Sequence, residues 1–444
     1  MRKYKLISIL VILSIYISNV FGYIEPDFEL ESEATVIYNI DFDQYVYSDK
    51  GEEILYPASI TKVMTALVIL NNTIDYNEKI TITYEMLDGL AAANASVMGL
   101  RVGEVISIKD LLYGLLLPSG ADAANALAYY NSHKIDAFVN EMNRTADKLG
   151  CTNTSFMNPT GLDHVKNYTT AKDLVLIMKE ALKYDLFKEI ISTNNYTTEP
   201  TNKHPKGITL KSTNAIRDPK NVYYSPYVLG GKTGYTTLAQ RTYVSYGMTD
   251  NGLSYIVVSL KSPFEGYYAT SKCFKDQGLI YDWLNEHFSS ITLKLKDDYY
   301  DTYKIVHSFT RDFDALLMND LEVLIDDTMT SADFTYKARV LDEYEATIVE
   351  GQFIGYLDAL NSDEEVVSTV SLKTATTVKK NTIVIVCEQI IDLVVEYFVE
   401  IIIIAVVMFV LSFILNMKKH DYDRKRKQEL YTKRRLKELR EDKE

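Results

Sequence analysis

Cysteine is scarce in this chain, which has three among 444 residues: Cys151, Cys273 and Cys387. So few cysteines exclude a disulfide-stapled scaffold and a zinc site built on clustered thiolates. Two interpretations stay open for Cys151 and Cys273, a single bridge or two free buried thiols. We favour the free thiols, because pairing cannot be deduced from spacing.

Positive charge is also in deficit, since the formal net charge is −14. The tail Met417–Glu444 holds twelve Lys or Arg against seven Asp or Glu, a net charge of +5, so the rest of the chain carries −19. An acidic body of this kind argues against a nucleic-acid partner. Low-complexity tracts and internal repeats are also absent, and the length predicts two folded domains with appendages.

Long apolar runs occur only near the two ends. Basic residues followed by the short run Leu6–Val20 predict a secretory signal peptide over residues 1–22, because a membrane span needs about 20 apolar residues. Residues 394–416 are long enough to form a transmembrane helix, with Glu396 and Glu400 at its outer edge. The basic tail 417–444 then lies in the cytoplasm by the positive-inside rule, and the body lies outside.

Between these ends, strands flank a helical middle. Ala34–Tyr38 and Tyr45–Tyr47 predict a hairpin, and further strands are expected at Tyr227–Leu229, Thr242–Tyr246 and Leu253–Leu260. Periodicity predicts helices at Ser59–Leu70, Ile108–Leu117, Asp122–Tyr130, Ile135–Leu149, Ala171–Tyr184 and Ser271–Phe288. This order predicts an α+β domain over residues 23–288, whose antiparallel sheet is closed by distant segments.

Helical periodicity ends after this domain. Short β-branched stretches recur instead, at Ile291–Leu295, Thr335–Val340 and Ala346–Ile348. They predict a small all-β domain over residues 289–380. We interpret it as a spacer between the first domain and the membrane.

Ser59-Ile60-Thr61-Lys62 is the first pattern with chemical meaning. Residues three apart on a helix share one face, so the Lys62 amine can reach the Ser59 hydroxyl. A lysine becomes a base for serine when burial lowers its pKa, and the apolar run behind Lys62 can supply that burial. Ser-x-x-Lys alone is a weak signal, because the two residues meet at this spacing by chance.

Two further patterns follow in order. Pro118-Ser119-Gly120 breaks two helices and places the Ser119 hydroxyl on a turn. The plain interpretation makes Ser119 the N-cap of the helix that opens at Asp122, and both can be true. Gly230-Gly231-Lys232-Thr233-Gly234 follows a strand, where Lys232 and Thr233 can bind a carboxylate; the plain alternative is a glycine-rich bend with a surface lysine. Ser-x-x-Lys, Ser-Gly-x and Lys-Thr-Gly in this order form a known set in serine penicillin-recognising enzymes.

With these motifs in hand, the chain resembles the low-molecular-weight penicillin-binding proteins, serine D-alanyl-D-alanine carboxypeptidases of peptidase family S11. The resemblance rests on 56–65 around Ser59, on Asn158–Leu162 with Thr169, Thr170 and Asp173, and on 231–236. It implies a penicillin-binding/β-lactamase-like catalytic domain that needs no metal or cofactor. It also implies removal of the terminal D-Ala from peptidoglycan stem pentapeptides, with β-lactams as covalent inhibitors.

The resemblance implies a role for each matching residue. Ser59 is expected to be the nucleophile, Lys62 its general base and Ser119 a proton relay to the leaving amine. Lys232 and Thr233 are expected to receive the substrate carboxylate. Gly234 and Tyr235 belong to the same substrate-binding segment, and the backbone N–H groups of Ser59 and Tyr235 are expected to form the oxyanion hole.

Two positions depart from the family pattern. The second motif usually ends in Asn but has Ala121 here, with Asn125 one helical turn further on. The arginine expected after the last strand is replaced by Tyr267 after Gly266, and Arg241 is a candidate substitute.

Other functions stay open beside the carboxypeptidase. A serine β-lactamase shares the three motifs but needs a deacylating glutamate, and the loop 152–170 holds Asp163 and no glutamate. A transpeptidase differs only in its acceptor. A catalytically weak penicillin-binding or muropeptide-sensing protein is the non-enzymatic alternative, because Ala121 removes an amide from the site.

Overall fold

The computed structural model describes residues 22–264 and 270–441, with side chains described to Leu436. The predicted signal peptide falls almost wholly on residues 1–21, outside the described residues. The chain divides into two compact units. The first contains the described residues up to Leu293 together with Leu321–Tyr336 and Asp358–Thr369, and the second contains Lys294–Asp320, Lys337–Leu357 and the chain from Val370.

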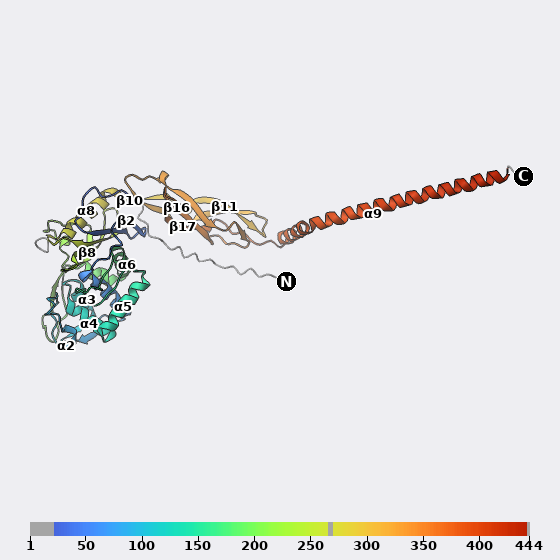
Figure 1. Ribbon diagram of the computed structural model, residues 1–444. Helices are drawn as coiled ribbons and strands as arrows, with labels where there is room; N and C mark the ends of the chain where they lie inside the picture. The colour runs from blue at the N-terminus through green and yellow to red at the C-terminus, as the bar shows by residue number, and fades with distance from the viewer. Residues whose placement is uncertain (1–21, 265–269, 442–444) are drawn as a thin grey trace. The chain divides into compact units, whose positions relative to one another are not determined.

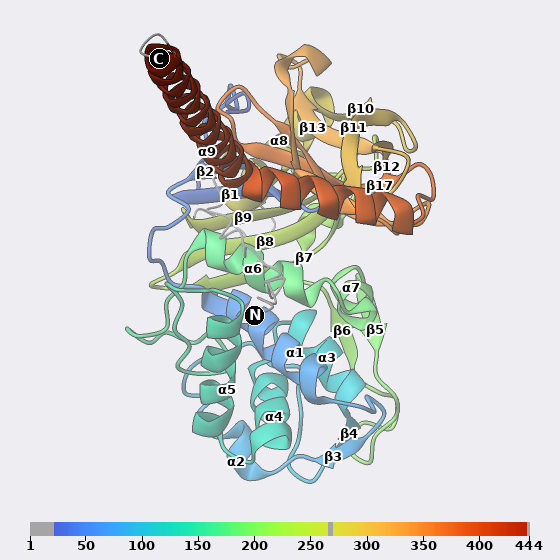
Figure 2. The same cartoon turned by 90° about the vertical axis from the view of Figure 1, so that its right-hand side faces the viewer.

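A five-stranded antiparallel sheet forms the centre of the first unit, in the order β2-β1-β9-β8-β7. Its strands are β1 (Ala34–Asn39), β2 (Gln44–Asp49), β7 (Val228–Thr236), β8 (Gln240–Met248) and β9 (Ser254–Ser262). The predicted hairpin thus pairs with a strand more than 200 residues later, which confirms the expected closure by distant segments. Helix α8 (Lys272–His287) covers one face, and the other helices of the unit gather on the opposite side (Figure 2).

The helical group contains α1 (Thr61–Asn72), α2 (Tyr84–Leu87), α3 (Ile108–Leu116), α4 (Ala121–Ser132), α5 (Ile135–Lys148), α6 (Ala171–Ala181) and α7 (Asp185–Ile191). Two short ribbons accompany it, β3 (Lys79–Thr81) with β4 (Val105–Ser107), and β5 (Asn195–Thr197) with β6 (Thr209–Lys211). All six predicted helices are present within a few residues. The short helices α2 and α7 and both ribbons were not predicted, because segments this short carry too little periodicity.

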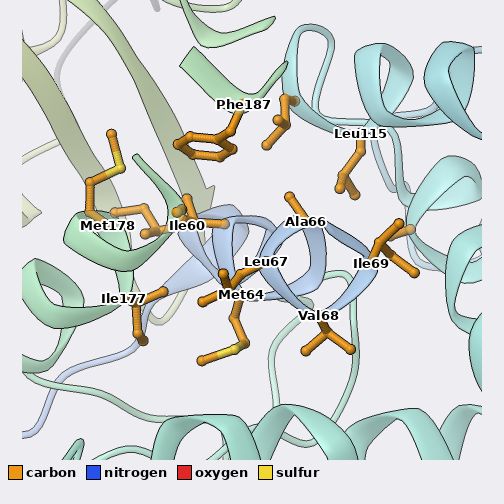
Figure 3. Packing of buried hydrophobic residues seen from close by; sticks show 14 of the residues in the cluster. Ile60, Met64, Ala66, Leu67, Val68, Ile69, Leu115, Ile177, Met178 and Phe187 are labelled. Atoms are coloured by element: carbon orange, nitrogen blue, oxygen red, sulfur yellow. The ribbon is translucent and has the colours of Figure 1, made fainter. Parts of the chain in front are cut away.

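Helix α1 is buried on all sides, as its apolar sequence predicts. Ten consecutive residues from Thr61 to Leu70 are buried. Figure 3 shows Met64, Leu67 and Val68 of this helix among Ile177, Met178 and Phe187 from α6 and α7 and Leu115 from α3. Each such side chain contributes about 1.5–3 kcal/mol of burial free energy, so α1 is a rigid base for the residues at its start.

The later chain is rich in strands, which confirms the predicted all-β region (Figure 1). A six-stranded sheet has the order β14-β16-β17-β12-β11-β15, and β10 (Phe288–Lys294) pairs with β13 (Leu321–Asp326). The six strands are β11 (Tyr299–Val306), β12 (Asp312–Leu317), β14 (Thr335–Val340), β15 (Glu343–Glu345), β16 (Phe353–Leu360) and β17 (Val366–Thr374). The predicted strand at Ala346–Ile348 is wrong: only an isolated bridge from Ile348 to Val378 forms there.

Helix α9 (Thr382–Glu441) is one continuous helix (Figure 1). It begins twelve residues before the predicted transmembrane helix, because Thr382–Leu393 has neither Gly nor Pro to interrupt it. Asn381 caps its start through hydrogen bonds from the backbone N–H groups of Ile383 and Val384. Among the described residues it is the helix long and apolar enough to cross a membrane.

Cys151 and Cys273 are free thiols, and both are buried. Burial raises the pKa of Cys151 above its usual range and that of Cys273 to about 12, so neither is a reactive thiolate. The interpretation of free buried thiols is confirmed.

Candidate active site

Ser59 lies where the chain turns into α1. It occupies a 3₁₀ turn, η1 (Ala58–Ile60), that leads directly into the helix, so the predicted α-helical start at Ser59 shifts to Thr61. Ala58 before it has a φ of 47°, in the left-handed region that favours glycine. This strained turn holds the serine hydroxyl at the first turn of a buried helix, where the helix dipole favours negative charge.

Lys62 is the immediate neighbour of Ser59. Its Nζ donates to Ser59 Oγ over 3.0 Å and to the backbone carbonyl of Thr160 over 2.5 Å. The side chain is 2% exposed, and burial lowers the pKa of Lys62 to about 7, partly opposed by the negative charge of Asp122. A large fraction of Lys62 is therefore an unprotonated amine near neutral pH, as a base requires.

Ser119 and Lys232 form a second buried pair. Lys232 Nζ donates to Ser119 Oγ over 2.9 Å and to the carbonyl of Thr233 over 2.8 Å. Burial and the nearby Lys62 charge hold the pKa of Lys232 well below its usual range. Ser119 has a φ of 65° and accepts no helical amide as a cap; Gly120 is the N-cap of α4. The helix-cap interpretation of Ser119 is therefore wrong.

The glycine-rich segment is not a bend. Gly230–Gly234 lies inside strand β7 and pairs along its length with β8, so the expectation that it ends a strand is corrected. Lys232 is 1% exposed, which also excludes the surface-lysine interpretation. β7 is an edge strand of the sheet, so its other edge pairs with no strand of this sheet among the described residues.

Two glycines let two walls meet at Ser59. A Cβ on Gly234 would lie 3.0 Å from the Ser59 backbone nitrogen, and one on Gly161 would lie 3.0 Å from the same nitrogen. A Cβ on Gly161 would also collide with the Ala58 carbonyl oxygen. The backbone φ of Gly161 is 77°, in the left-handed region. Only glycine allows strand β7 and the 158–163 loop to approach the nucleophile this closely.

A cavity of about 690 Å³ opens at this junction. Its lining includes Ser59, Lys62, Ser119, Thr233, Gly234 and Tyr235 from the predicted set, and also Ala121, Thr160, Asp163, Thr213 and Arg241. Lys232 lies behind this surface and reaches it through Ser119. Asn125 is not among the lining residues. The structure thus brings the three sequence motifs to one cavity.

Arg241 is held in this lining by aromatic rings. Its guanidinium lies 4.5 Å from the ring centroid of Tyr235 and 4.8 Å from that of Phe264. Such cation–π contacts hold an arginine in one orientation. The position of Tyr267, the other residue in this prediction, falls outside the described residues.

Several residues around the cavity were missed at the sequence level. Thr213 Oγ1 lies 2.7 Å from Thr233 Oγ1, although the two are 20 positions apart. Asp122 accepts hydrogen bonds from the backbone N–H groups of Met98, Gly99 and Leu100 and so fixes the neighbouring wall. No motif reveals such contacts, but the carboxylate of Asp122 at the start of a predicted helix was a usable signal.

We expect Asp122→Ala to destabilise the fold by about 2–4 kcal/mol, because the buried amides of Met98 and Leu100 and the part-buried amide of Gly99 lose their acceptor. Urea denaturation measures this change. Asp147→Ala, at an exposed position in the same unit, should stay within about 0.5 kcal/mol of the wild type. Equal stabilities of the two variants would show that the Asp122 network contributes nothing.

Comparison with known proteins agrees with this geometry. The family model described as D-alanyl-D-alanine carboxypeptidase, peptidase S11, matches residues 21–263. The chain belongs to this family. The matched residues include all three motifs.

Curated relatives and solved structures extend this result. D-alanyl-D-alanine carboxypeptidase DacF of Bacillus subtilis is 34% identical over 207 residues, 46% of this chain and 51% of that protein. The alignment thus spans about half the length of that relative. The Streptomyces K15 DD-transpeptidase structure is 29% identical, with a TM-score of 0.51 over 58% of this chain and 97% of that one.

Penicillin binding protein 5 from Haemophilus influenzae shows the wider fold. Its structure is 22% identical, with a TM-score of 0.64 over 81% of this chain and 100% of that chain. This match covers more of the chain than the family model, so the shared fold continues beyond the residues that the family model matches.

Proposed function

We propose that this S11 family member is a serine-type D-alanyl-D-alanine carboxypeptidase. The observation that carries the proposal is the pair of contacts Lys62–Ser59 and Lys232–Ser119 at one cavity. A serine hydroxyl beside a buried amine of pKa about 7 is suited to acyl transfer. The substrate would be a peptidoglycan stem pentapeptide ending in D-Ala-D-Ala.

The proposed reaction has two steps. Ser59 Oγ attacks the carbonyl carbon of the penultimate D-Ala while its proton passes to Lys62. The peptide C–N bond then breaks, the leaving D-Ala amine takes a proton through Ser119, and an ester remains on Ser59. Water hydrolyses this ester and restores the serine.

Groups around Ser59 would stabilise the negative charges of the oxyanion and of the substrate carboxylate. The backbone N–H groups of Ser59 and Tyr235 would bind the developing oxyanion, each contributing about 3–4 kcal/mol of transition-state stabilisation. Lys232 would orient the Ser119 hydroxyl through its hydrogen bond to Ser119 Oγ. Thr233 and Arg241 would hold the terminal carboxylate, and the aromatic rings around Arg241 support this role because they hold its guanidinium against the cavity.

The test is release of free D-Ala from a synthetic stem pentapeptide, measured for the wild type and for Ser59→Ala. We expect release by the wild type alone. Penicillin labelling without D-Ala release would favour the sensing function. The likeness to the K15 DD-transpeptidase supports a transpeptidase as the alternative. An added acceptor amine distinguishes it, because a transpeptidase would form a new peptide in place of part of the hydrolysed product.

The domain limits stay a proposal: a catalytic domain at 23–288, a β-rich domain at 289–380, a membrane helix at 394–416 and a tail at 417–444. The family acts on peptidoglycan, and a helix apolar enough to span a membrane is present. The body would then lie on the outer face of the bacterial membrane, with β-lactams as covalent inhibitors.

The topology is tested with an epitope tag added after Glu444 and with protease added to intact protoplasts. We expect the tag to stay undigested, because the basic tail favours the cytoplasm. Permeabilised cells, in which the epitope should be cleaved, serve as the control. Digestion of the tail from outside would contradict the proposed orientation.

A further inference from the structure

Asp163 is a carboxylate at the cavity that the proposed reaction does not use. It follows Gly161 by two residues, and Gly161 packs against the Ser59 backbone. Two residues of extended chain span at most about 7 Å, so Asp163 stays beside the nucleophile. Its side chain is exposed and lines the same cavity as Ser59.

Two carboxylates of the segments that carry the sequence motifs are already engaged. Asp122 accepts three backbone amides, and Asp173 accepts the Thr154 hydroxyl and the Asn153 amide. Asp163 makes no hydrogen bond or ion pair with the residues that the structure describes. It is also the one acidic residue among those that line the cavity. An acceptor of this kind is available to a ligand.

The loop that carries Asp163 is held in place. The Asn158 side-chain oxygen accepts hydrogen bonds from the backbone N–H groups of Thr160 and Gly161. Its side-chain NH₂ group donates a hydrogen bond to the Leu162 carbonyl. Lys62 donates to the Thr160 carbonyl. The loop backbone is thus fixed as far as Leu162, the residue before Asp163, and this holds Asp163 at the wall of the cavity.

The cavity also carries opposite charges on two different walls. Arg241 is on strand β8, which pairs with β7, while Asp163 is on the 158–163 loop. Ser59 lies between these walls, because Gly234 and Gly161 both pack against its backbone nitrogen. A bound peptide with its carboxylate toward Arg241 therefore has its upstream residues available to Asp163.

We infer that Asp163 is a specificity-determining residue that binds the side-chain ammonium of a diamino acid next to the penultimate D-Ala. The inference rests on the proposed function, since it assumes that this peptide acylates Ser59. A free amine is protonated near neutral pH and forms an ion pair with the carboxylate, whereas an acetylated amine is neutral and can offer only one amide N–H. The site would then select stem peptides whose side-chain amine is not yet cross-linked.

The experiment uses two pentapeptides, L-Ala-D-Glu-L-Lys-D-Ala-D-Ala with the lysine amine free or acetylated. Each competes with a fluorescent penicillin for the full-length protein, and the concentration that halves labelling is measured. We expect the wild type to prefer the free amine by about fivefold. Asp163→Asn should remove this preference, Asp163→Lys should reverse it, and Asp147→Asn should keep it.

A wild type without preference, or an unchanged preference in Asp163→Asn, would overturn the inference while leaving the proposed function intact. D-Ala release from the same peptides is measured in parallel. Release of D-Ala from both peptides without a preference for the free amine would contradict only the role of Asp163. Absence of both labelling and release would remove the proposed function and the inference together.

Discussion

Replacing Lys62 with methionine should slow acylation of the protein by penicillin about 1000-fold, because general-base catalysis of this kind contributes about 10²–10⁴ in rate. Methionine keeps the buried volume but cannot accept the Ser59 proton. The measurement is the rate of covalent labelling by penicillin, followed in samples quenched at a series of times. Lys183→Met, at an exposed position in the turn after α6, should keep the wild-type rate.

The same residue predicts the pH dependence of the wild type. Burial lowers the pKa of Lys62 to about 7, and only the unprotonated amine can accept a proton. The labelling rate should therefore rise with pH, reach half its maximum near pH 7, and stay high above it. A rate that does not change between about pH 5 and 9 would contradict the role of Lys62 as base.

Replacing Gly161 with alanine should slow labelling about 100-fold, because a displacement of about 1 Å near the nucleophile costs this much. The new Cβ collides with the Ala58 carbonyl oxygen and lies 3.0 Å from the Ser59 nitrogen. The loop must then move, and its Thr160 carbonyl leaves Lys62.

Gly150→Ala is the matched control for this prediction. Gly150 also has a positive φ, 82°, but a Cβ there meets nothing within 4 Å. Both variants should lose about 1 kcal/mol of stability from the left-handed backbone, while only Gly161→Ala should lose labelling rate. Equal rates in the two variants would show that the close approach to Ser59 is not needed.

Sequence patterns predicted the elements with long periodicity. Helix α1, the hairpin β1–β2 and strands β8 and β9 were predicted because their apolar residues recur over many positions. The order of the three motifs was enough to suggest the family before any geometry was known. The all-β region was predicted as a class, but the order of its strands was not.

The remainder could not be predicted because it depends on contacts between distant residues. The sequence left two interpretations of Lys232 open, a carboxylate-binding residue or a surface lysine in a glycine-rich bend. Only the pairing of β7 with β8 and the contact with Ser119 show that it is buried. The hydrogen bond between Thr213 and Thr233 joins two segments with no shared motif. The start of α9 at Thr382 was missed because acidic residues interrupt its apolar pattern.

Mass spectrometry of the wild-type protein after reaction with benzylpenicillin tests the central claim most directly. We expect one penicilloyl group per protein, carried by the peptide that contains Ser59, and no adduct on Ser59→Ala. An adduct on another residue, or a wild type that stays unmodified, would contradict the assignment of Ser59 as the nucleophile.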